Sequence, residues 1–290
     1  MSAANEWNAN IYLKMTLENS RQEWYDAEKR VSVTMVDVKT AAQALARGHL
    51  SGPAAAYYLS KALAAVALLG SECSEDDETV ILQMKCKGPL GGFNVECTSA
   101  GTLRGYTEKK ILDDFDSLGK YDEKAIVGER QIQVTRSKPG KIISQGISNS
   151  LDGYLAGSLQ RKACIYLEAS VNDEVEILEA RGVMVEALPD SEWPVSTGTA
   201  AIHEELRKGK GGVLAVSPRK ILDKIGLSNA ELKKSSPLSF ACRCSPERAI
   251  ALLKSMSEEE LKTLPEKLDI TCHMCGRVFT VSTGIKRDEA

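Results

Sequence analysis

Four cysteines near the C-terminus have the spacing of a metal site. Cys242 and Cys244 flank a single residue, and Cys272 and Cys275 flank two. Short pairs of this kind converge on one tetrahedral Zn²⁺ in structural zinc sites. The C-x-C half differs from the two C-x-x-C pairs of the common zinc ribbon. The sequence therefore predicts one Zn²⁺ per chain, bound by all four thiolates.

A small lobe over residues 237–290 has to position these cysteines. Ser245-Pro246 is typical of a helix start, and Ser257 with Glu260 forms a capping-box pattern that opens a second short helix, which ends at Pro265. Two strands, Asp269–Thr271 and Arg277–Val281, flank the second cysteine pair as a hairpin. We expect Ile250, Leu253 and Met256 to face inward. So few apolar side chains hold a fold poorly, and a metal would supply the missing stability.

The longer N-terminal part, residues 1–188, reads as a mixed sheet and helix domain. Alternation of Leu82, Met84 and Cys86 with polar neighbours predicts a half-buried strand. Helices are expected from Pro53 to Leu69 and from Asn149 to Gln160. Strands are predicted at Ile11–Leu17, Val31–Val36, Thr79–Lys87, Phe93–Cys97, Gln131–Arg136, Cys164–Ser170 and Val183–Leu188. The expected fold class is α+β, an antiparallel-rich sheet with packed helices.

Residues 189–236 form a predicted helical linker between the two parts. Short helical patterns span Ala200–Lys208 and Ser217–Gly226, the second with Pro218 at its first position. Helices this short are marginal alone, so we expect them to fold only by docking on the sheet domain. Their apolar residues are Ile202, Leu206, Ile221, Leu222 and Ile225.

Composition narrows the function classes. The 290 residues carry a net charge of −3, and only 5% are aromatic, which disfavours a nucleic-acid binder. No signal-peptide pattern opens the chain, and its longest apolar stretch, Ala62–Gly70, is too short to cross a membrane. We therefore expect a cytoplasmic protein, where thiols stay reduced and paired cysteines serve metal binding or redox sensing.

We expect the remaining cysteines and the histidines to lie outside the metal site. Cys86, Cys97 and Cys164 are interpreted as buried apolar residues, and Cys73 is expected to be exposed beside an acidic run that raises its pKa. His273 lies inside the second cysteine pair, but four thiolates already complete a tetrahedron, so we expect a solvated turn residue. Surface positions are expected for His49 and His203.

Several motifs resemble those of the redox-regulated thirty-three-kilodalton heat-shock chaperones, a family of holdases. The most specific are Phe240–Ala249 around the first cysteine pair, Ser257–Leu261, and Thr271–Gly276 around the second. Upstream, Lys87–Gly92, Leu103–Tyr106 and Gln145–Ile147 are also similar to the family. The stretch Tyr154–Tyr166, in the family's proposed client and dimer surface, departs from it.

The resemblance implies a mechanism. Reduced thiolates hold zinc and the chaperone is inactive; oxidation forms the disulfides Cys242–Cys244 and Cys272–Cys275 and releases the metal. The linker then undocks, and the exposed apolar surface binds unfolding proteins without nucleotide. The resemblance also implies a homodimer on activation and no enzymatic activity, nucleic acid or membrane partner.

Two other classes stay open on the residues alone. One is a constitutive zinc-ribbon binding module for nucleic acid or a translation partner, disfavoured by equal numbers of acidic and basic residues after Cys242. The other is a thiol oxidoreductase using Cys272 and Cys275, disfavoured because this C-x-x-C does not open a helix in a βαβ unit.

Overall fold

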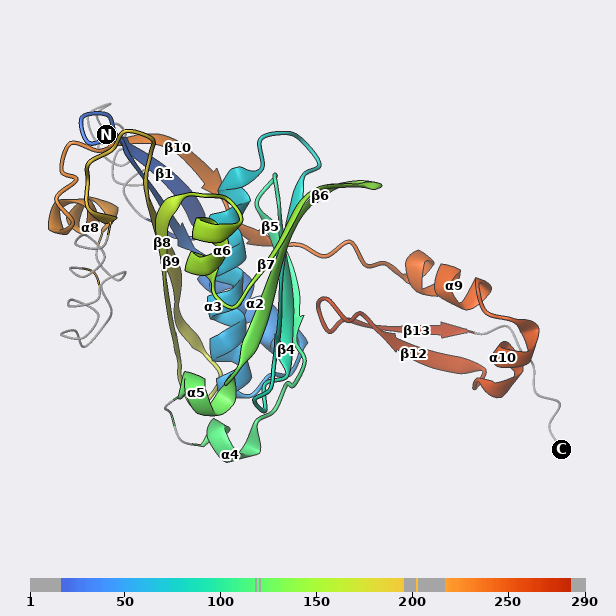
Figure 1. Cartoon of the computed structure of the whole chain (residues 1–290). Helices are drawn as coiled ribbons and strands as arrows, with labels where there is room; N and C mark the ends of the chain where they lie inside the picture. Colours follow the sequence, from blue (N-terminus) through green and yellow to red (C-terminus); the bar gives the residue numbers. More distant parts are fainter. Residues whose placement is uncertain (1–16, 118, 120, 196–201, 203–216, 283–290) are drawn as a thin grey trace, which may run out of the picture.

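Two largely antiparallel sheets enclose a central helix, and a small lobe projects from them (Figure 1). This computed structural model describes residues 17–117, 119, 121–195, 202 and 217–282. The α+β class with antiparallel sheets is confirmed. The predicted strand at 11–17 lies outside the described residues, apart from Leu17.

The first sheet has the strand order β10-β1-β2-β9-β8, and the second has β11-β5-β4-β3-β6-β7. Strands of the first sheet are β1 (Ser20–Asp26), β2 (Val31–Asp37), β8 (Lys162–Val171), β9 (Ile177–Ala187) and β10 (Glu231–Pro237). Strands of the second are β3 (Thr79–Cys86), β4 (Gly92–Thr98), β5 (Thr102–Thr107), β6 (Arg130–Lys138), β7 (Lys141–Ser148) and β11 (Ser239–Phe240). The sequence did not predict β1, β5, β7, β10 or β11.

Helix α3 (Pro53–Leu69) lies between the sheets and is apolar on almost every side, with Lys61 as its one charged residue. Such a helix is stable only when it is surrounded, and nearly all of its residues are buried. Pro53 occupies its first turn as expected, and Asp116 accepts a hydrogen bond from the amide of Ala54 at 2.9 Å. With the short helix that follows, Pro53–Glu72 has the length and hydropathy of a membrane span, but 83% of that window is buried inside the protein.

Shorter helices complete the core. They are α2 (Lys39–Gly48), η1 (Gly70–Glu72), α4 (Asp113–Asp116), α5 (Glu123–Ile126) and α6 (Leu151–Gly157). The prediction of a helix within 149–160 is confirmed by α6, whereas α2 was not predicted. Helix α6 contacts β8 and β7, which are the edge strands of the two sheets, and so closes one side of the core.

The predicted linker covers the outer face of the first sheet. Helix α8 (Pro218–Lys224) places Ile221 and Leu222, both fully buried, against a cluster that includes Trp24, Val33 and Val185. Ser217 precedes the helix as expected, although its side chain makes no capping hydrogen bond. Ile202 is also buried in this cluster; the rest of the helix predicted at 200–208 lies outside the described residues.

The last part of the predicted linker is a strand rather than a helix. Strand β10 pairs antiparallel with β1, and its polar sequence gives no apolar alternation that could have predicted it. It leads directly into β11, which adds to the second sheet beside β5. One continuous segment thus connects the docked helix α8, both sheets of the core and the first cysteine pair.

The lobe has the predicted elements, namely α9 (Pro246–Lys254), α10 (Glu258–Thr263) and the hairpin β12 (Lys267–Thr271)–β13 (Val278–Ser282). The capping box of Ser257 and Glu260 is present. Leu253 faces inward as expected, but Ile250 is 39% exposed, so that prediction is wrong. The buried face of α9 is formed by Ala249 and Leu253, one turn apart, which pack with Val281 of β13; Ile250 is not part of this small core.

Candidate metal centre

The four predicted ligands meet at one point. All four Sγ atoms lie within 4.8 Å of one another, with Cys242–Cys272 at 3.8 Å and Cys244–Cys275 at 3.5 Å. A tetrahedral site with metal–sulfur bonds of about 2.3 Å has sulfur–sulfur edges of roughly 3.8 Å. The cluster could therefore hold a metal ion with little movement of its side chains.

Two turns aim these sulfurs at each other. Cys272–Cys275 form the tip of the β12–β13 hairpin, where the Gly276 amide donates to the Cys272 carbonyl at 2.8 Å. Gly276 has φ of +74°, a conformation that favours glycine and lets the chain reverse directly after the last cysteine. Cys242 and Cys244 follow β11 and precede α9, in the segment that leaves the core.

Thiols this close together cannot all ionise without a cation. Burial opposes ionisation of Cys242, but the Cys244 amide and the Arg104 guanidinium lower the pKa of this thiol to about 7. Burial and the neighbouring thiols raise the pKa of Cys275 above its usual value, and burial raises the pKa of Cys244. The thiolate is favoured at Cys242 and disfavoured at Cys244 and Cys275, so a bound divalent cation would supply the missing positive charge.

The core contributes a charged network that sequence analysis missed. Glu96 and Arg104 are cross-strand partners on β4 and β5 and form an ion pair. Arg104 reaches the Cys242 sulfur at 3.8 Å, and Arg243, between the first two cysteines, donates to Glu96 at 2.8 Å. The alternation of Leu103, Arg104 and Gly105 would have indicated a strand with its arginine on the polar face.

Of the three histidines, the two that the structure describes, His49 and His273, do not join the cluster. His273 is exposed, as expected of a turn residue, and its ring lies edge-on to Tyr106 with a centroid distance of 4.0 Å. His49 is half-buried rather than at the surface, with its Nε2 2.9 Å from the carbonyl oxygen of Gly105. Burial and the nearby Lys110 lower the pKa of His49. His203 lies outside the described residues.

The four other cysteines lie away from the cluster. Cys97 is fully buried as expected, while Cys86 and Cys164 are half-buried. Cys73 is only 8% exposed, so the prediction of an exposed thiol is wrong. The turn after α3 folds it inward; burial first, then Glu78, raises its pKa. Cys97 pairs with Val80, not with Cys86, in the β3–β4 register, in agreement with the prediction that these two do not bridge.

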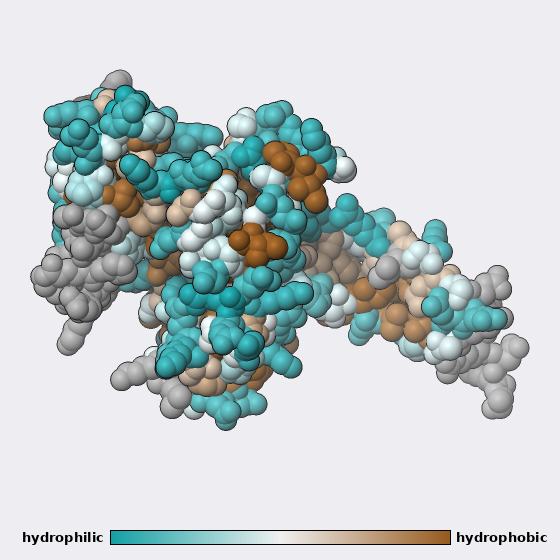
Figure 2. Space-filling model, viewed as in Figure 1, coloured by the Kyte–Doolittle hydropathy of each residue, from teal (hydrophilic) through white to brown (hydrophobic). Residues whose placement is uncertain are grey.

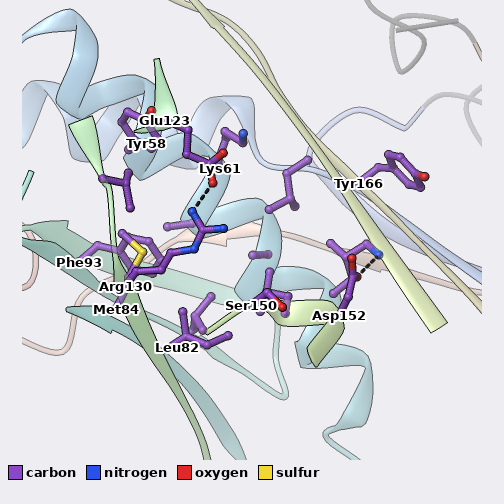
Figure 3. A pocket seen from close by; sticks show the side chains of 17 residues that line it. Tyr58, Lys61, Leu82, Met84, Phe93, Glu123, Arg130, Ser150, Asp152 and Tyr166 are labelled. Atoms are coloured by element: carbon purple, nitrogen blue, oxygen red, sulfur yellow. Dashed lines mark hydrogen bonds and ion pairs between the residues drawn. The ribbon is translucent and has the colours of Figure 1, made fainter. Parts of the chain in front are cut away.

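A cavity of about 380 Å³ lies apart from the cysteines, between the sheets where α6 and β8 approach α3 (Figure 3). Leu82, Met84 and Phe93 supply part of its apolar lining. Arg130 forms an ion pair with Glu123, and Asp152 accepts a hydrogen bond from the Ile165 amide at 3.0 Å. These charged groups have partners within the protein, and none of the residues that line the cavity is a cysteine.

Comparison with known proteins decides the family. The family model described as Hsp33 protein matches residues 21–282. The chain belongs to the Hsp33 family. It is 30% identical over 254 residues to a 33 kDa chaperonin of Symbiobacterium thermophilum, covering 81% of this chain and 85% of that protein. It is 26% identical over 274 residues to a 33 kDa chaperonin of a Geobacillus species, covering 88% and 90%.

A solved structure shares the fold. The crystal structure of the 33 kDa chaperonin of Thermotoga maritima, described as a heat shock protein 33 homolog, aligns with a TM-score of 0.76 at 18% identity. The alignment covers 92% of this chain and 95% of that one. The family resemblance of the sequence motifs is therefore confirmed. Membership of a chaperone family implies that the chain binds client proteins.

We predict that the four cysteines outside the cluster are dispensable for any redox response of this Hsp33-family chain. A variant with Cys73, Cys86, Cys97 and Cys164 all replaced by Ala should, if folded, show the same change of chaperone activity with peroxide as the wild type. Circular dichroism would establish that the variant is folded before activity is compared. A folded variant that no longer responds to peroxide would show that the switch extends beyond the cluster.

We also predict slow alkylation of two of these thiols. Burial raises the pKa of Cys97 to about 12, and burial with Asp152 raises that of Cys164 to about 12. Because only the thiolate reacts, both should alkylate more than about a hundredfold slower than an exposed cysteine near pH 8, and faster as the pH rises. Iodoacetamide labelling with peptide mapping measures this, with urea-unfolded chain as the fully reactive control. Equal rates in folded and unfolded chain would contradict the burial.

Proposed function

We propose that this chain is a redox-regulated, ATP-independent holdase that is zinc-bound and inactive when reduced. Oxidation to disulfides with zinc release activates it, and it then binds unfolding proteins and prevents their aggregation. One observation carries the proposal. The four sulfurs form a cluster of the size of a tetrahedral metal site. Strands β10 and β11 connect this cluster directly to helix α8, which is docked on the first sheet.

The donor set fits Zn²⁺, and Cys242, Cys244, Cys272 and Cys275 would hold it. Four thiolates suit a soft, tetrahedral ion, and the sulfur separations match such a site. Zinc, when bound, keeps the thiols deprotonated at neutral pH. The lobe has a core of a few apolar residues only, including Ala249, Leu253 and Val281, so the ligand bonds would provide much of its stability.

Oxidation would dismantle this arrangement. Each pair of thiols gives two electrons to one peroxide, which leaves as two waters, and a disulfide forms. The proposed pairs are Cys242–Cys244 and Cys272–Cys275. In the reduced cluster, sulfur contacts also run between the two turns, from Cys242 to Cys272 and from Cys244 to Cys275. Pairing within each turn would remove these sulfur contacts and leave only the small apolar core to hold the lobe together.

The surface under the linker is the proposed client site. Ile221, Leu222 and Ile225 are almost completely buried against the outer face of the first sheet. If the lobe no longer restrains β10 and α8, this face becomes accessible together with the linker itself. An unfolding protein, which exposes apolar side chains of its own, is the partner that such a surface would bind.

The organisation we propose has three parts: a chaperone core at 1–188, a metastable linker at 189–236 and a zinc-binding lobe at 237–290. We further propose that the protein acts in the cytoplasm, where a reducing environment keeps the switch off, that it dimerises on activation, and that it is not an enzyme.

Light scattering of a heat-unfolded test protein checks this function. Reduced, zinc-loaded chain should leave the aggregation unchanged, and chain treated with peroxide should suppress it at near-stoichiometric amounts without nucleotide. Equal suppression by both forms would indicate a constitutive chaperone. No suppression by either form would refute the holdase function.

A further inference from the structure

The tip of the lobe hairpin is docked on the core, not only tethered to it. The amide of Gly105 on β5 donates to the carbonyl of Met274, between the second pair of cysteines, at 3.1 Å. The contact lies where the β12–β13 hairpin meets the second sheet (Figure 1). The outward-facing amide of a core strand therefore depends on the metal-binding turn for its hydrogen bond.

A glycine on α2 makes this close approach possible. A Cβ atom at Gly48, the last residue of that helix, would lie 2.5 Å from the carbonyl oxygen of Cys275. In return, a Cβ at Gly276 would overlap the carbonyl oxygen of Gly48. Two backbones in contact leave no room for a side chain on either side. The end of α2 and the cysteine turn are thus fitted to each other.

Charge adds to this fit. Glu96 is almost completely buried and accepts from both Arg104 and Arg243, which brings two guanidinium groups together beside the cluster. A divalent cation with four thiolates keeps a net negative charge. The Arg104 side chain, 15% exposed and 3.8 Å from the Cys242 sulfur, can offset that charge. Arg243 reaches the same carboxylate from the lobe side.

We propose that four core residues, Gly48, Glu96, Arg104 and Gly105, form a docking patch that is part of the metal centre. Arg104 and Glu96 are positioning residues that hold the cysteine turns and neutralise their charge, and the patch raises the affinity of the cluster for Zn²⁺. Loss of the metal would then break the contacts of the cysteine turn with β5 and α2, in addition to any effect on the linker. This inference rests on the proposed zinc binding.

Zinc affinity of the full chain tests the patch. Arg104→Met should raise the Kd for Zn²⁺, measured by competition with a chelator, by about tenfold or more, and Arg104→Lys should recover part of the loss. Glu96→Gln should weaken binding too, because both arginines lose the carboxylate charge that they share. The matched control is Arg248→Gln, which removes the same charge from an exposed position in the lobe and should leave the Kd unchanged.

Gly48→Ala separates docking from general stability. Alanine favours a helix over glycine by up to about 1 kcal/mol, so the core should be no less stable. The new methyl group nevertheless collides with the cysteine turn, and the Kd for Zn²⁺ should rise by about tenfold. Loss of zinc affinity without loss of core stability is not expected of a merely structural change, and this variant decides the matter if Arg104→Met folds poorly.

The amide of Gly105 reports docking at a single site. Its hydrogen exchange, followed by nuclear magnetic resonance, should speed up on zinc removal and in Gly48→Ala, while neighbouring amides bonded within the sheet stay protected. Wild-type zinc affinity in both Arg104→Met and Gly48→Ala, in chains that do bind zinc, would overturn the docking patch and leave the proposed function standing. A wild-type chain that takes up no zinc would instead overturn the proposed function and this inference with it.

Discussion

Replacing Cys244 by Ser is expected to reduce the affinity for Zn²⁺ about a hundredfold. A structural zinc site contributes about 10–16 kcal/mol, so the loss of one of four ligands costs about 3 kcal/mol. Ser is a poor zinc ligand at neutral pH. The substitution would also remove the sulfur–sulfur contact between Cys244 and Cys275, which is 3.5 Å long. The lobe, with its small apolar core, should lose much of its helix content.

Zinc per chain, measured by mass spectrometry of metals after dialysis against a weak chelator, checks this result. Cys164→Ser is the matched control, because Cys164 lies on β8 in the core. This variant should keep one zinc per chain. Full zinc occupancy of Cys244→Ser would remove Cys244 from the ligand set.

The second large effect is expected in the linker. Hydrogen exchange of residues 217–227 should be slow in the reduced chain and fast after peroxide, because Ile221 and Leu222 are fully buried only while α8 is docked. Helix α8 has only seven residues and cannot persist alone. Equal protection before and after oxidation, in chain that suppresses aggregation, would place the client surface elsewhere.

A substitution can imitate the oxidised linker. Leu222→Asp buries an unpaired carboxylate against the apolar face of the first sheet, which is costly enough to undock a short helix. The reduced variant should therefore suppress aggregation without peroxide. Lys220→Asp, on the exposed side of the same helix, introduces the same group without this penalty and should remain inactive when reduced. An inactive Leu222→Asp with a rapidly exchanging linker would contradict the role of this surface.

Exposed apolar residues elsewhere on the core should bind some client protein regardless of oxidation, and so contribute a constant background to these aggregation assays. Ile142 and Ile147 on β7 are 62% and 57% exposed. Figure 2 shows hydrophobic patches interrupting a mostly hydrophilic face of the core. We expect the edge strand β7 to stay in place on oxidation, so its contribution to client binding should not change. Only the oxidant-dependent part of client binding then reports on the linker.

The sequence predicted best where residue type and spacing act locally. The cysteine spacing gave a cluster whose sulfurs meet, and the Ser257 capping box and the Pro53 helix start depend on neighbours within one turn. Alternating Leu82 and Met84 gave β3, since one face of that strand packs in the core.

Predictions failed where distant parts of the chain decide the outcome. Strand β1 buries Arg21, whose guanidinium donates to the carbonyl of Ala67 on α3 at 3.2 Å; an arginine in a core position hides the strand pattern. Strand β10 exists because β1 offers it an edge. Arg104 and Cys242 are 138 positions apart in the sequence, and no local pattern could reveal their contact.

The link between metal loss and chaperone activity is tested by measuring zinc release and client binding simultaneously during peroxide treatment. A chromogenic chelator follows free zinc while light scattering of a heat-unfolded test protein follows chaperone activity in matched samples. We expect about one zinc per chain to be released, activity never to precede the release, and reduction with zinc to restore the inactive form. Full activity while the zinc remains bound to the cysteines would contradict this link.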